Sequence, residues 1–441
     1  MGSEQRARPI VIVTGANAGV GYAICQRLLL QLAQRLPSDG LPQRSIARSI
    51  SIDEAAEIDL EDFAECEGIT LILACRSVSK AEQARKEFVA LLDNEVEKIK
   101  RTKGGADANH AQSFRDNVDL VVQRIDLASA ESVFSFARAI NSKYPYVSHL
   151  VCNAGVASFI GYDWPLACKQ LLTDFLGAVT SPLFKLQRIG ELSEDGLGWI
   201  WQCNVFGHYM LFRLLEPLLN RYRGLTRAPS RVLWMSSLEA NPACYDPEDW
   251  QLVRNARSYE ASKYQIDLLA GWFEQRQQRA LSVSDKKREA GFKDGNANTQ
   301  VPVRHFLFHP GVVRTNIATK SLNSNVLDFL MQLSFLMAHF LGSRVHVITP
   351  YKSAIPAVHL MLVALPFITV ASSNLPGSEK PKSQKAPTPL KFGAHVDYWF
   401  NEYVGTMPVP EWEERQDQAA ELVQHCEELF LELKKKQTEK S

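Results

Sequence analysis

Short apolar runs alternate along the chain with longer segments whose apolar residues recur at helical spacing. The runs are apolar throughout, which is typical of strands buried on both faces of a parallel sheet. The expected strands are residues 10–13, 69–74, 118–125, 148–152, 230–235 and 303–308. The expected helices are residues 22–36, 79–92, 130–140, 199–219 and 259–279. This order predicts an α/β fold with a doubly wound parallel sheet, in a single domain with long insertions.

The insertions are expected to form surface loops, because several are charged or rich in Gly and Asn. They are residues 37–67, 94–117, 156–198, 239–257 and 281–300. Residues 377–389 have the composition of a linker, and the apolar spacing in residues 411–436 predicts an amphipathic helix that packs on the body or meets a partner. We therefore divide the chain into a sheet domain at 1–320, an apolar lid or membrane-associated segment at 321–376, and a linker with a C-terminal helix at 377–441.

Two late apolar stretches bear on membrane contact. Residues 326–341 are rich in Leu, Phe and Met, but they contain Asp328 and His339 and are shorter than the roughly 20 apolar residues of a spanning helix. Residues 354–371 are interrupted by prolines. Both stretches either form core or lid helices or enter one leaflet of a bilayer. Residues 1–9 are short and polar, which is not the pattern of a secretory signal.

Composition narrows the class of protein. The chain has 49 Lys and Arg and 49 Asp and Glu, so its net charge gives no reason to expect nucleic acid. None of the 8 cysteines forms a Cys-x-x-Cys pair, and several lie in apolar runs, which favours a reduced, cytosol-facing compartment. His305 and His309 flank a strand and not a helix, so their spacing does not indicate a metal site, and no metal is expected.

A glycine-rich turn follows the first strand, with Gly15, Gly19 and Gly21 around Asn17 and Val20. Glycine permits a tight strand-to-helix turn and lets the backbone approach a diphosphate, which then lies at the positive end of the helix. An ordinary tight turn is the alternative. The strand before and the expected helix after the turn favour dinucleotide binding and a Rossmann-like fold.

The ends of the next two strands indicate which dinucleotide is bound. Arg76 follows the second strand, where an acidic residue would bind a free ribose 2′-hydroxyl and an arginine complements a 2′-phosphate. A solvent-facing arginine is the alternative. Asp126 ends the third strand, where an adenine ring would lie, although capping a helix is a competing role.

Tyr259 precedes Lys263 by four residues on a helix that follows the pair Ser236-Ser237. Side chains at positions i and i+4 share one face of a helix. A tyrosine titrates near 10, so it is a poor acid at neutral pH unless its surroundings change its pKa. We expect the Lys263 ammonium and an oxidised nicotinamide to lower that pKa and make Tyr259 an acid-base group. A plain helix surface is the alternative.

Taken together and in this order, these motifs resemble the short-chain dehydrogenase/reductase family over roughly residues 10–320. The motifs are Gly15/Gly19/Gly21, Asn153-Ala154-Gly155, Asn204, Ser236-Ser237, Tyr259/Lys263 and Pro310-Gly311-x-Val313-x-Thr315. The resemblance implies NADPH as cofactor. It implies cofactor contacts at Gly15, Asn17, Gly19, Val20, Gly21, Arg76, Asp126, Asn153, Tyr259, Lys263, Val313 and Thr315.

The resemblance also implies catalytic roles. Tyr259 would protonate a carbonyl oxygen, and Lys263 would hold the nicotinamide ribose and lower the pKa of Tyr259. Ser237 would hydrogen-bond the carbonyl, with Ser236 as the alternative, and Asn204 would hold a water that links Lys263 to solvent. Tyr259 lies 22 positions after Ser237, which is longer than the family's usual gap, so that loop is reshaped. Large insertions after Asn153 and Thr315 would build the substrate pocket.

Within the family, the chain is similar to the fungal reductases that act on sterol 3-ketones during C-4 demethylation in ergosterol biosynthesis. The supporting segments are residues 156–198, 201–207, 236–240 and 258–263. This similarity implies reduction of a sterol 3-ketone to the 3β-alcohol at the cytosolic face of the endoplasmic reticulum membrane or a lipid droplet, beside membrane-bound enzymes of sterol biosynthesis. The alternatives are a reductase of another lipid carbonyl (retinoid, fatty-acyl or 17-keto steroid) and a non-catalytic scaffold of a membrane sterol complex.

Overall fold

The computed structural model describes residues 8–43, 65–222, 229–289, 303–313, 325–368 and 388–440. Its centre is a sheet with the strand order β12-β11-β8-β7-β4-β1-β2-β3, in which every neighbouring pair is parallel except β11 and β12. The strands are β1 (Ile10–Thr14), β2 (Ile69–Cys75), β3 (Val118–Arg124), β4 (His149–Cys152), β7 (Arg231–Met235), β8 (Arg304–His309), β11 (Leu390–Val396) and β12 (Glu402–Pro408). The predicted doubly wound α/β fold is confirmed.

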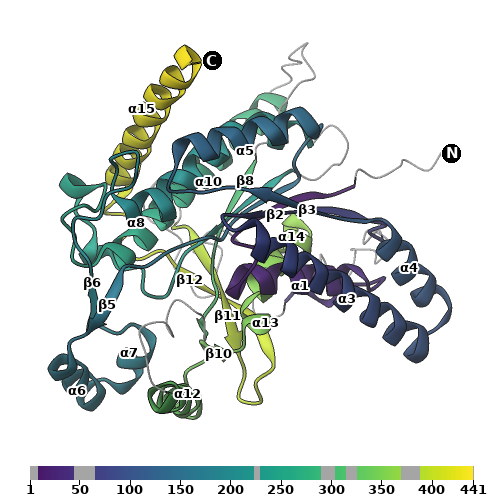
Figure 1. The fold of residues 1–441 in the computed structure, drawn as a ribbon, viewed down its shortest axis with the longest axis horizontal. Coiled ribbons are helices and arrows are strands. Elements are labelled where there is room, and N and C mark those ends of the chain that lie inside the picture. The colour runs from purple at the N-terminus through teal and green to yellow at the C-terminus, as the bar shows by residue number, and fades with distance from the viewer. Residues whose placement is uncertain are drawn as a thin grey trace.

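Helices cover both faces of this sheet (Figure 1). Successive strand residues point to opposite faces, so Ile10 and Ile12 join one apolar cluster and Val11 and Val13 the other. The first cluster lies under α5 (Ala130–Lys143), α9 (Gly207–Tyr222), α10 (Ser258–Glu289) and α15 (Gln416–Lys440). The second lies under α1 (Gly19–Leu32), α3 (Val78–Thr102), α4 (Gly105–Asp116) and α14 (Ile355–Leu362).

Smaller elements extend the carboxyl-end edge of the sheet. One insertion forms the antiparallel pair β5 (Phe159–Tyr162) and β6 (Lys185–Gln187), with α6 (Trp164–Thr173) and α7 (Phe175–Thr180) between them. Further along the chain lie β9 (Val312–Val313), α12 (Asn325–Phe340), β10 (His346–Ile348) and α13 (Pro350–Ser353). The predicted helix at 199–219 is present as α8 (Trp199–Trp201), a π-helical turn η4 (Gln202–Phe206) and α9.

Several expectations need correction. Residues 156–198 contain β5, α6, α7 and β6, and residues 281–289 belong to α10, so neither stretch is a plain surface loop. Residues 94–117 are not a surface loop: α3 continues to Thr102 and α4 follows at once. Residues 355–361 are buried beneath the sheet, so this part of the apolar stretch 354–371 is core and does not enter a leaflet. The segment after residue 377 is more than a linker and a helix, because β11 and β12 belong to the main sheet. Most of the predicted linker lies outside the described residues.

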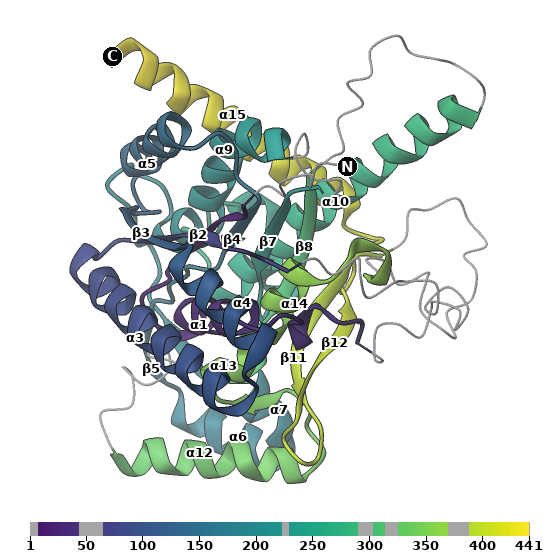
Figure 2. The ribbon, with the colours of Figure 1, turned by 90° about the vertical axis from the view of Figure 1, so that its right-hand side faces the viewer.

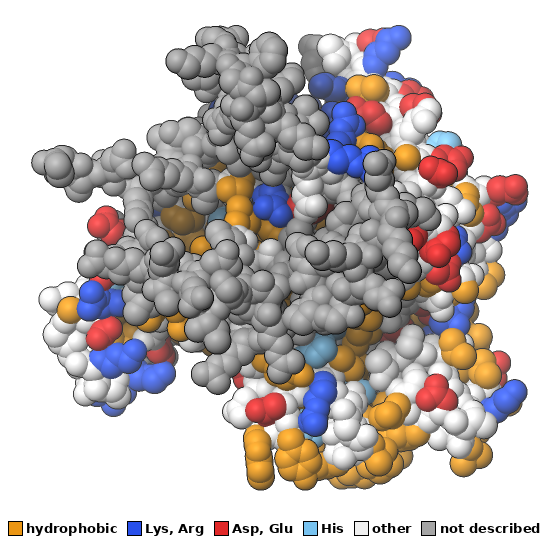
Figure 3. Space-filling model, turned by 180° about the vertical axis from the view of Figure 1, so that it is seen from behind, with side chains coloured by type: hydrophobic (Ala, Val, Ile, Leu, Met, Phe, Trp, Pro, Cys, Tyr) orange, Lys and Arg blue, Asp and Glu red, His pale blue; other side chains and the backbone are white. Residues whose placement is uncertain are grey.

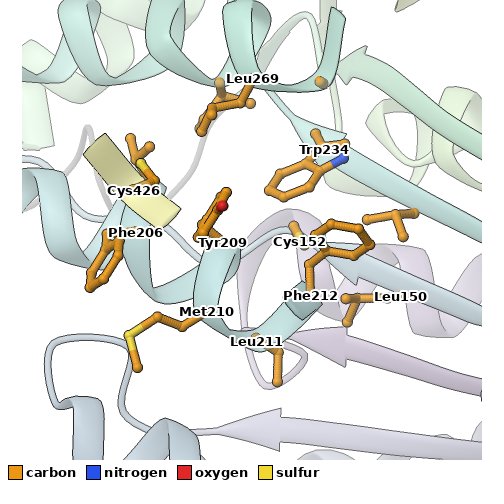
Figure 4. Packing of buried hydrophobic residues seen from close by; sticks show 14 of the residues in the cluster. Leu150, Cys152, Phe206, Tyr209, Met210, Leu211, Phe212, Trp234, Leu269 and Cys426 are labelled. Carbon is orange, nitrogen blue, oxygen red and sulfur yellow. The ribbon is translucent and has the colours of Figure 1, made fainter. Parts of the chain in front are cut away.

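The helix expected at 411–436 is α15, and it packs on the body of the molecule (Figure 2). Figure 4 shows how α9 lies between the sheet and this helix, with Trp234 of β7 on one side and Cys426 of α15 on the other. The Tyr209 hydroxyl of α9 donates to a carboxylate oxygen of Glu427 at 2.5 Å. The C-terminal helix therefore closes the same apolar cluster that supports the sheet.

We predict that Leu422→Ala lowers the free energy of unfolding by about 2–5 kcal/mol, because Leu422 of α15 is fully buried and its removal leaves a cavity. The measurement is urea denaturation followed by circular dichroism. Leu431→Ala, on the exposed side of the same helix, is the matched control and should change stability by less than about 0.5 kcal/mol. Equal stability of the two variants would mean that α15 does not pack on the body in solution.

Candidate active site

The glycine-rich turn connects β1 to α1 next to the end of β4. Gly15 has a φ of +70°, and its N–H donates to the Ala74 carbonyl of β2 at 2.8 Å. A Cβ on Gly21 would lie 2.4 Å from the Gly15 carbonyl oxygen and 2.4 Å from Nδ2 of Asn153. The turn can approach β4 only because these positions carry no side chain.

At the amino end of α1, neither the cap residue nor the first turn supplies a group that neutralises the helix dipole. The cap residue, Ala18, offers no side-chain hydrogen bond, and the first turn contains no acidic residue. The free N–H groups and the helix dipole favour an anion there. Asn17 is half-buried and Val20 is buried in the same turn. A dinucleotide's diphosphate fits this end of the helix.

Asn153 of the predicted Asn153-Ala154-Gly155 motif is held against the turn. Its Nδ2 donates to the Thr14 carbonyl at 2.8 Å, and its backbone N–H donates to the Thr14 hydroxyl at 2.9 Å. Its Oδ1 is buried and has no hydrogen-bond partner among the described residues. These contacts lie between β1 and β4, where the strand order reverses and where ligands bind in doubly wound sheets.

Arg76 and Asp126 both lie near Cys203 of η4. The pKa of the Cys203 thiol is raised to about 12, mainly by burial and also by the Asp126 carboxylate, while the Arg76 guanidinium opposes the shift. Arg76 is exposed, with no hydrogen bond or ion pair to another described residue. Asp126 does not cap α5, because Ser129 occupies that position and accepts a hydrogen bond from Ser132. The two predicted adenosine-binding residues therefore share one region.

Lys263 lies in the interior of the site with only 2% of its surface exposed. Its ammonium donates to the Met235 carbonyl at the end of β7 at 2.9 Å and lies 5.9 Å from the centre of the Tyr259 ring. Burial lowers the pKa of Lys263 to about 8, while the Asp267 carboxylate acts in the opposite direction. Gly155 borders Lys263, since a Cβ there would lie 3.5 Å from its Nζ.

The pKa of Tyr259 is raised in the chain itself, contrary to our expectation that Lys263 would lower it. Burial is the main cause, because it removes water from the phenolate, and the Glu239 carboxylate adds to the shift. A hydrogen bond with Ser237 acts in the opposite direction. Tyr259 is therefore a protonated phenol at neutral pH, and it can donate a proton but not accept one.

The two candidate serines have different surroundings. Ser237 is half-buried, and its hydroxyl contacts the Tyr259 phenol and accepts the Glu239 N–H at 3.1 Å. Ser236 is only 1% exposed, and its hydroxyl lies between the Lys263 carbonyl and the Lys391 ammonium. The geometry favours Ser237 as the serine that contacts a substrate beside Tyr259.

Asn204 uses its side-chain amide within the protein. Its Oδ1 accepts the Val156 N–H at 2.8 Å, and its Nδ2 donates to the Val156 carbonyl and the Ser262 hydroxyl, both at 3.0 Å. It lies in the π-helical turn η4, 3.4 Å from where a Gly155 Cβ would lie. Asn204 thus joins α9, α10 and the segment after β4, and its role in holding a water stays a prediction.

The insertion after β4 covers Tyr259. The Phe159 ring meets the Tyr259 ring edge-on with centroids 5.7 Å apart, and Lys185 pairs with Glu239 at 2.8 Å. Gln187 of β6 accepts the Tyr259 N–H at 2.9 Å and so holds the start of α10. No periodic pattern in the sequence indicates these contacts, because they join segments that lie far apart in the chain.

The last predicted positions lie at the edge of the site. Val313 is half-buried in β9, which pairs with β10, and Thr315 lies outside the described residues. The described residues contain no group of His, Cys, Asp or Glu that could hold a metal. His305 accepts a hydrogen bond from Trp234 at 3.1 Å, and burial lowers the pKa of His305 to about 3.

The chain is similar to several known proteins, although no family model matches it. The 3-keto-steroid reductase erg27 of Aspergillus fumigatus is 30% identical over 380 residues, which cover 81% of this chain and 74% of the relative. A 3-keto-steroid reductase of Eremothecium gossypii is 29% identical over 307 residues, 70% of this chain and 75% of the relative. The structure of L-sorbose reductase from Gluconobacter frateurii, with NADPH and L-sorbose, is 13% identical at a TM-score of 0.41, over 81% of this chain and 91% of that chain.

The doubly wound sheet brings a tyrosine and a lysine of one helix to the end of β7, which is the arrangement that the resemblance to the short-chain dehydrogenases/reductases predicts. The sequence similarity to known proteins identifies a particular family. Because the Aspergillus relative matches over most of both chains, the protein belongs to the 3-keto-steroid reductase family.

We predict that Arg76 sets the preference for NADPH over NADH. A charge-assisted contact to the 2′-phosphate is worth roughly 1–3 kcal/mol, so NADPH should bind more tightly by that amount and Arg76→Asp should reverse the order. Cofactor fluorescence titration measures both affinities. Arg101→Asp, at the far end of α3, is the control and should leave the ratio unchanged. An unchanged ratio in Arg76→Asp would mean that another group reads the 2′-phosphate.

Proposed function

We propose that the protein reduces a sterol 3-ketone to the 3β-hydroxysterol with NADPH, as a step of C-4 demethylation in sterol biosynthesis. One observation carries this proposal. The half-buried Tyr259, a protonated phenol, lies in hydrogen-bond contact with Ser237 and beside Lys263, in a chain whose curated relatives are named 3-keto-steroid reductases. A protonated phenol is what ketone reduction requires of its acid.

The cofactor residues of this chain fit NADPH. The uncapped amino end of α1 suits the diphosphate, the orphaned Asn153 Oδ1 accepts one more hydrogen bond, and the exposed Arg76 suits the 2′-phosphate. When bound, NADPH supplies a hydride to the carbonyl carbon. Lys263, which already orients its ammonium toward the end of β7, would bind the ribose hydroxyls.

The protein groups act on the carbonyl oxygen. The Tyr259 hydroxyl would transfer its proton to the carbonyl oxygen as the ketone is reduced, which gives the alcohol. Ser237 donates a hydrogen bond to the same oxygen and stabilises its developing charge. The Lys263 ammonium then stabilises the tyrosinate until solvent returns a proton, and Asn204 would hold the water on that route.

We predict that Tyr259→Phe lowers turnover of a sterol 3-ketone by at least 10²–10⁴-fold, roughly the contribution of a general acid, while NADPH affinity changes little. NADPH consumption with a panel of carbonyl substrates is the measurement, and it also separates sterols from other lipid carbonyls. Tyr264→Phe is the matched control on the same helix, because its hydroxyl donates to the Pro410 carbonyl outside the site. Near-normal turnover of Tyr259→Phe would place the acid elsewhere.

We further propose that the protein works at the cytosolic face of the endoplasmic reticulum or a lipid droplet, beside other membrane-bound sterol enzymes. A sterol ketone is almost insoluble in water, so an enzyme gains by taking it from a lipid surface. Among the described residues, no helix combines the length and apolar character needed to cross a bilayer. We expect the protein to contact one leaflet through an exposed apolar surface.

An exposed apolar surface supports this proposal, and orange side chains gather along the lower edge of Figure 3. The surface comprises side chains of α12, of the α6–α7 insertion and of the β11–β12 turn. On α12, which packs against α7, the exposed side chains are Phe329, Leu330, Leu333, Leu336, Met337, Phe340 and the following Leu341. Trp164, Leu171, Leu172, Leu176, Tyr398 and Trp399 extend it. Exposed apolar patches of this kind mark membrane or protein contacts.

We predict that the intact protein floats with liposomes, and that changing Phe329, Leu333, Leu336 and Phe340 to Ser leaves it in the soluble fraction. All four side chains are exposed, so the substitutions remove apolar contact with lipid without opening the core. Changing the exposed Leu36 and Leu431, away from α12, to Ser is the control and should not alter flotation. Equal partitioning of all three proteins would contradict the proposal that this surface binds a membrane.

A further inference from the structure

A second buried lysine lies behind the site. Lys391 is on β11, the strand beside the edge strand β12 of the main sheet, and is 2% exposed. Its ammonium donates to Oδ2 of Asp267 at 2.5 Å, to the Ser236 hydroxyl at 3.1 Å and to the Ser237 carbonyl at 3.2 Å. These three acceptors use the three N–H groups of the ammonium. Lys391 thereby joins β11 to both the end of β7 and helix α10.

Stability alone does not account for this ion pair. The Asp267 side chain is fully buried, and removing two charges from water costs several kcal/mol per ion. Well-packed apolar residues of similar volume often stabilise a core equally well or better. A pair of charges that is retained at this depth, in contact with Ser236 and Ser237, suggests a role in the site.

The Lys391–Asp267 pair is connected to Tyr259, Ser237 and Lys263 through few contacts. Asp267 follows Lys263 by four residues and Tyr259 by eight, so all three lie on one face of α10. The Ser237 carbonyl is held by Lys391, while the Ser237 hydroxyl contacts Tyr259. Losing the Lys391 contact would free the main chain that carries this hydroxyl.

The pair also balances the charge around Lys263. The Asp267 carboxylate raises the pKa of Lys263 and the Lys391 ammonium lowers it. The other titratable groups that face these lysines are Tyr259 on α10, His208 on α9, and His309 on β8 beside Lys391. Burial lowers the pKa of both histidines, so they stay neutral at physiological pH. Asp267 and Lys391 are therefore the charges that act on Lys263.

We propose that Lys391 and Asp267 are positioning residues, which hold Ser237 against Tyr259 and fix the charge balance around Lys263. This inference rests on the proposed reductase function. Neither residue touches the substrate; both act through Ser237 and Lys263.

The test compares Lys391→Met, Asp267→Asn and the double variant. Lys391→Met should raise the pH midpoint of Lys263 by about one unit and Asp267→Asn should lower it, because a nearby charge shifts a pKa by that order. Nitrogen NMR of labelled lysine, with Lys263→Met to assign the signal, follows the midpoint without any substrate. The double variant should titrate near the wild-type midpoint, yet turn over the sterol ketone about tenfold more slowly, since Ser237 is no longer held.

The controls are Arg27→Met and Asp39→Asn, which break another buried ion pair, 2.5 Å long and remote from Tyr259. They should lower stability and leave the Lys263 midpoint unchanged. If Lys391→Met does not fold, the double variant and Asp267→Asn still decide the question. Midpoints that do not move in opposite directions, or wild-type turnover in the double variant, would overturn the inference. Absence of ketone reduction by the wild type would instead overturn the proposed function, because the NMR titration does not depend on it.

Discussion

The site depends on keeping one cation out of water. Burial of Lys263 weakens its hold on the proton, so the ammonium persists only where acceptors replace its lost hydration. The Met235 carbonyl at the end of β7 is one such acceptor, and it fixes how closely α10 approaches the sheet. The packing of α9, α10 and α15 in one apolar cluster maintains that approach. The fold and the chemistry are therefore coupled through the spacing between α10 and β7.

The apolar runs predicted the strands at the centre of the sheet, because a strand that is buried on both faces must be apolar at nearly every position. β1, β2, β3, β4, β7 and β8 all lie where the sequence indicated. β11 and β12 were missed because Gly393 and Gly405 face each other across the pair and weaken the strand signal. A Cβ on Gly393 would lie 2.1 Å from the His309 ring. Packing therefore requires glycine at this position, although glycine has a low propensity for strands.

Local spacing revealed part of the site, and long-range contacts formed the rest. Tyr259, Lys263 and the glycine turn follow from i,i+4 spacing and turn chemistry. Asp267 continues that spacing and could have been found. Lys391 could not, because 124 positions separate it from Asp267. The pKa of Tyr259 was expected to fall, but loss of water and the Glu239 carboxylate raise it, and the sequence does not show how deeply a side chain lies.

The surroundings of Tyr259 keep its phenol protonated. Glu239 and Glu260 both favour the neutral phenol, yet each is tied to a cation, Glu239 to Lys185 and Glu260 to Arg257. A sterol offers few polar groups, so its ketone oxygen must be recognised by hydrogen bonds and its rings by shape. The hairpin that places Phe159 against Tyr259 supplies an apolar wall for such rings. Binding would exclude the remaining water and keep the proton on Tyr259 until the carbonyl oxygen becomes basic enough to take it.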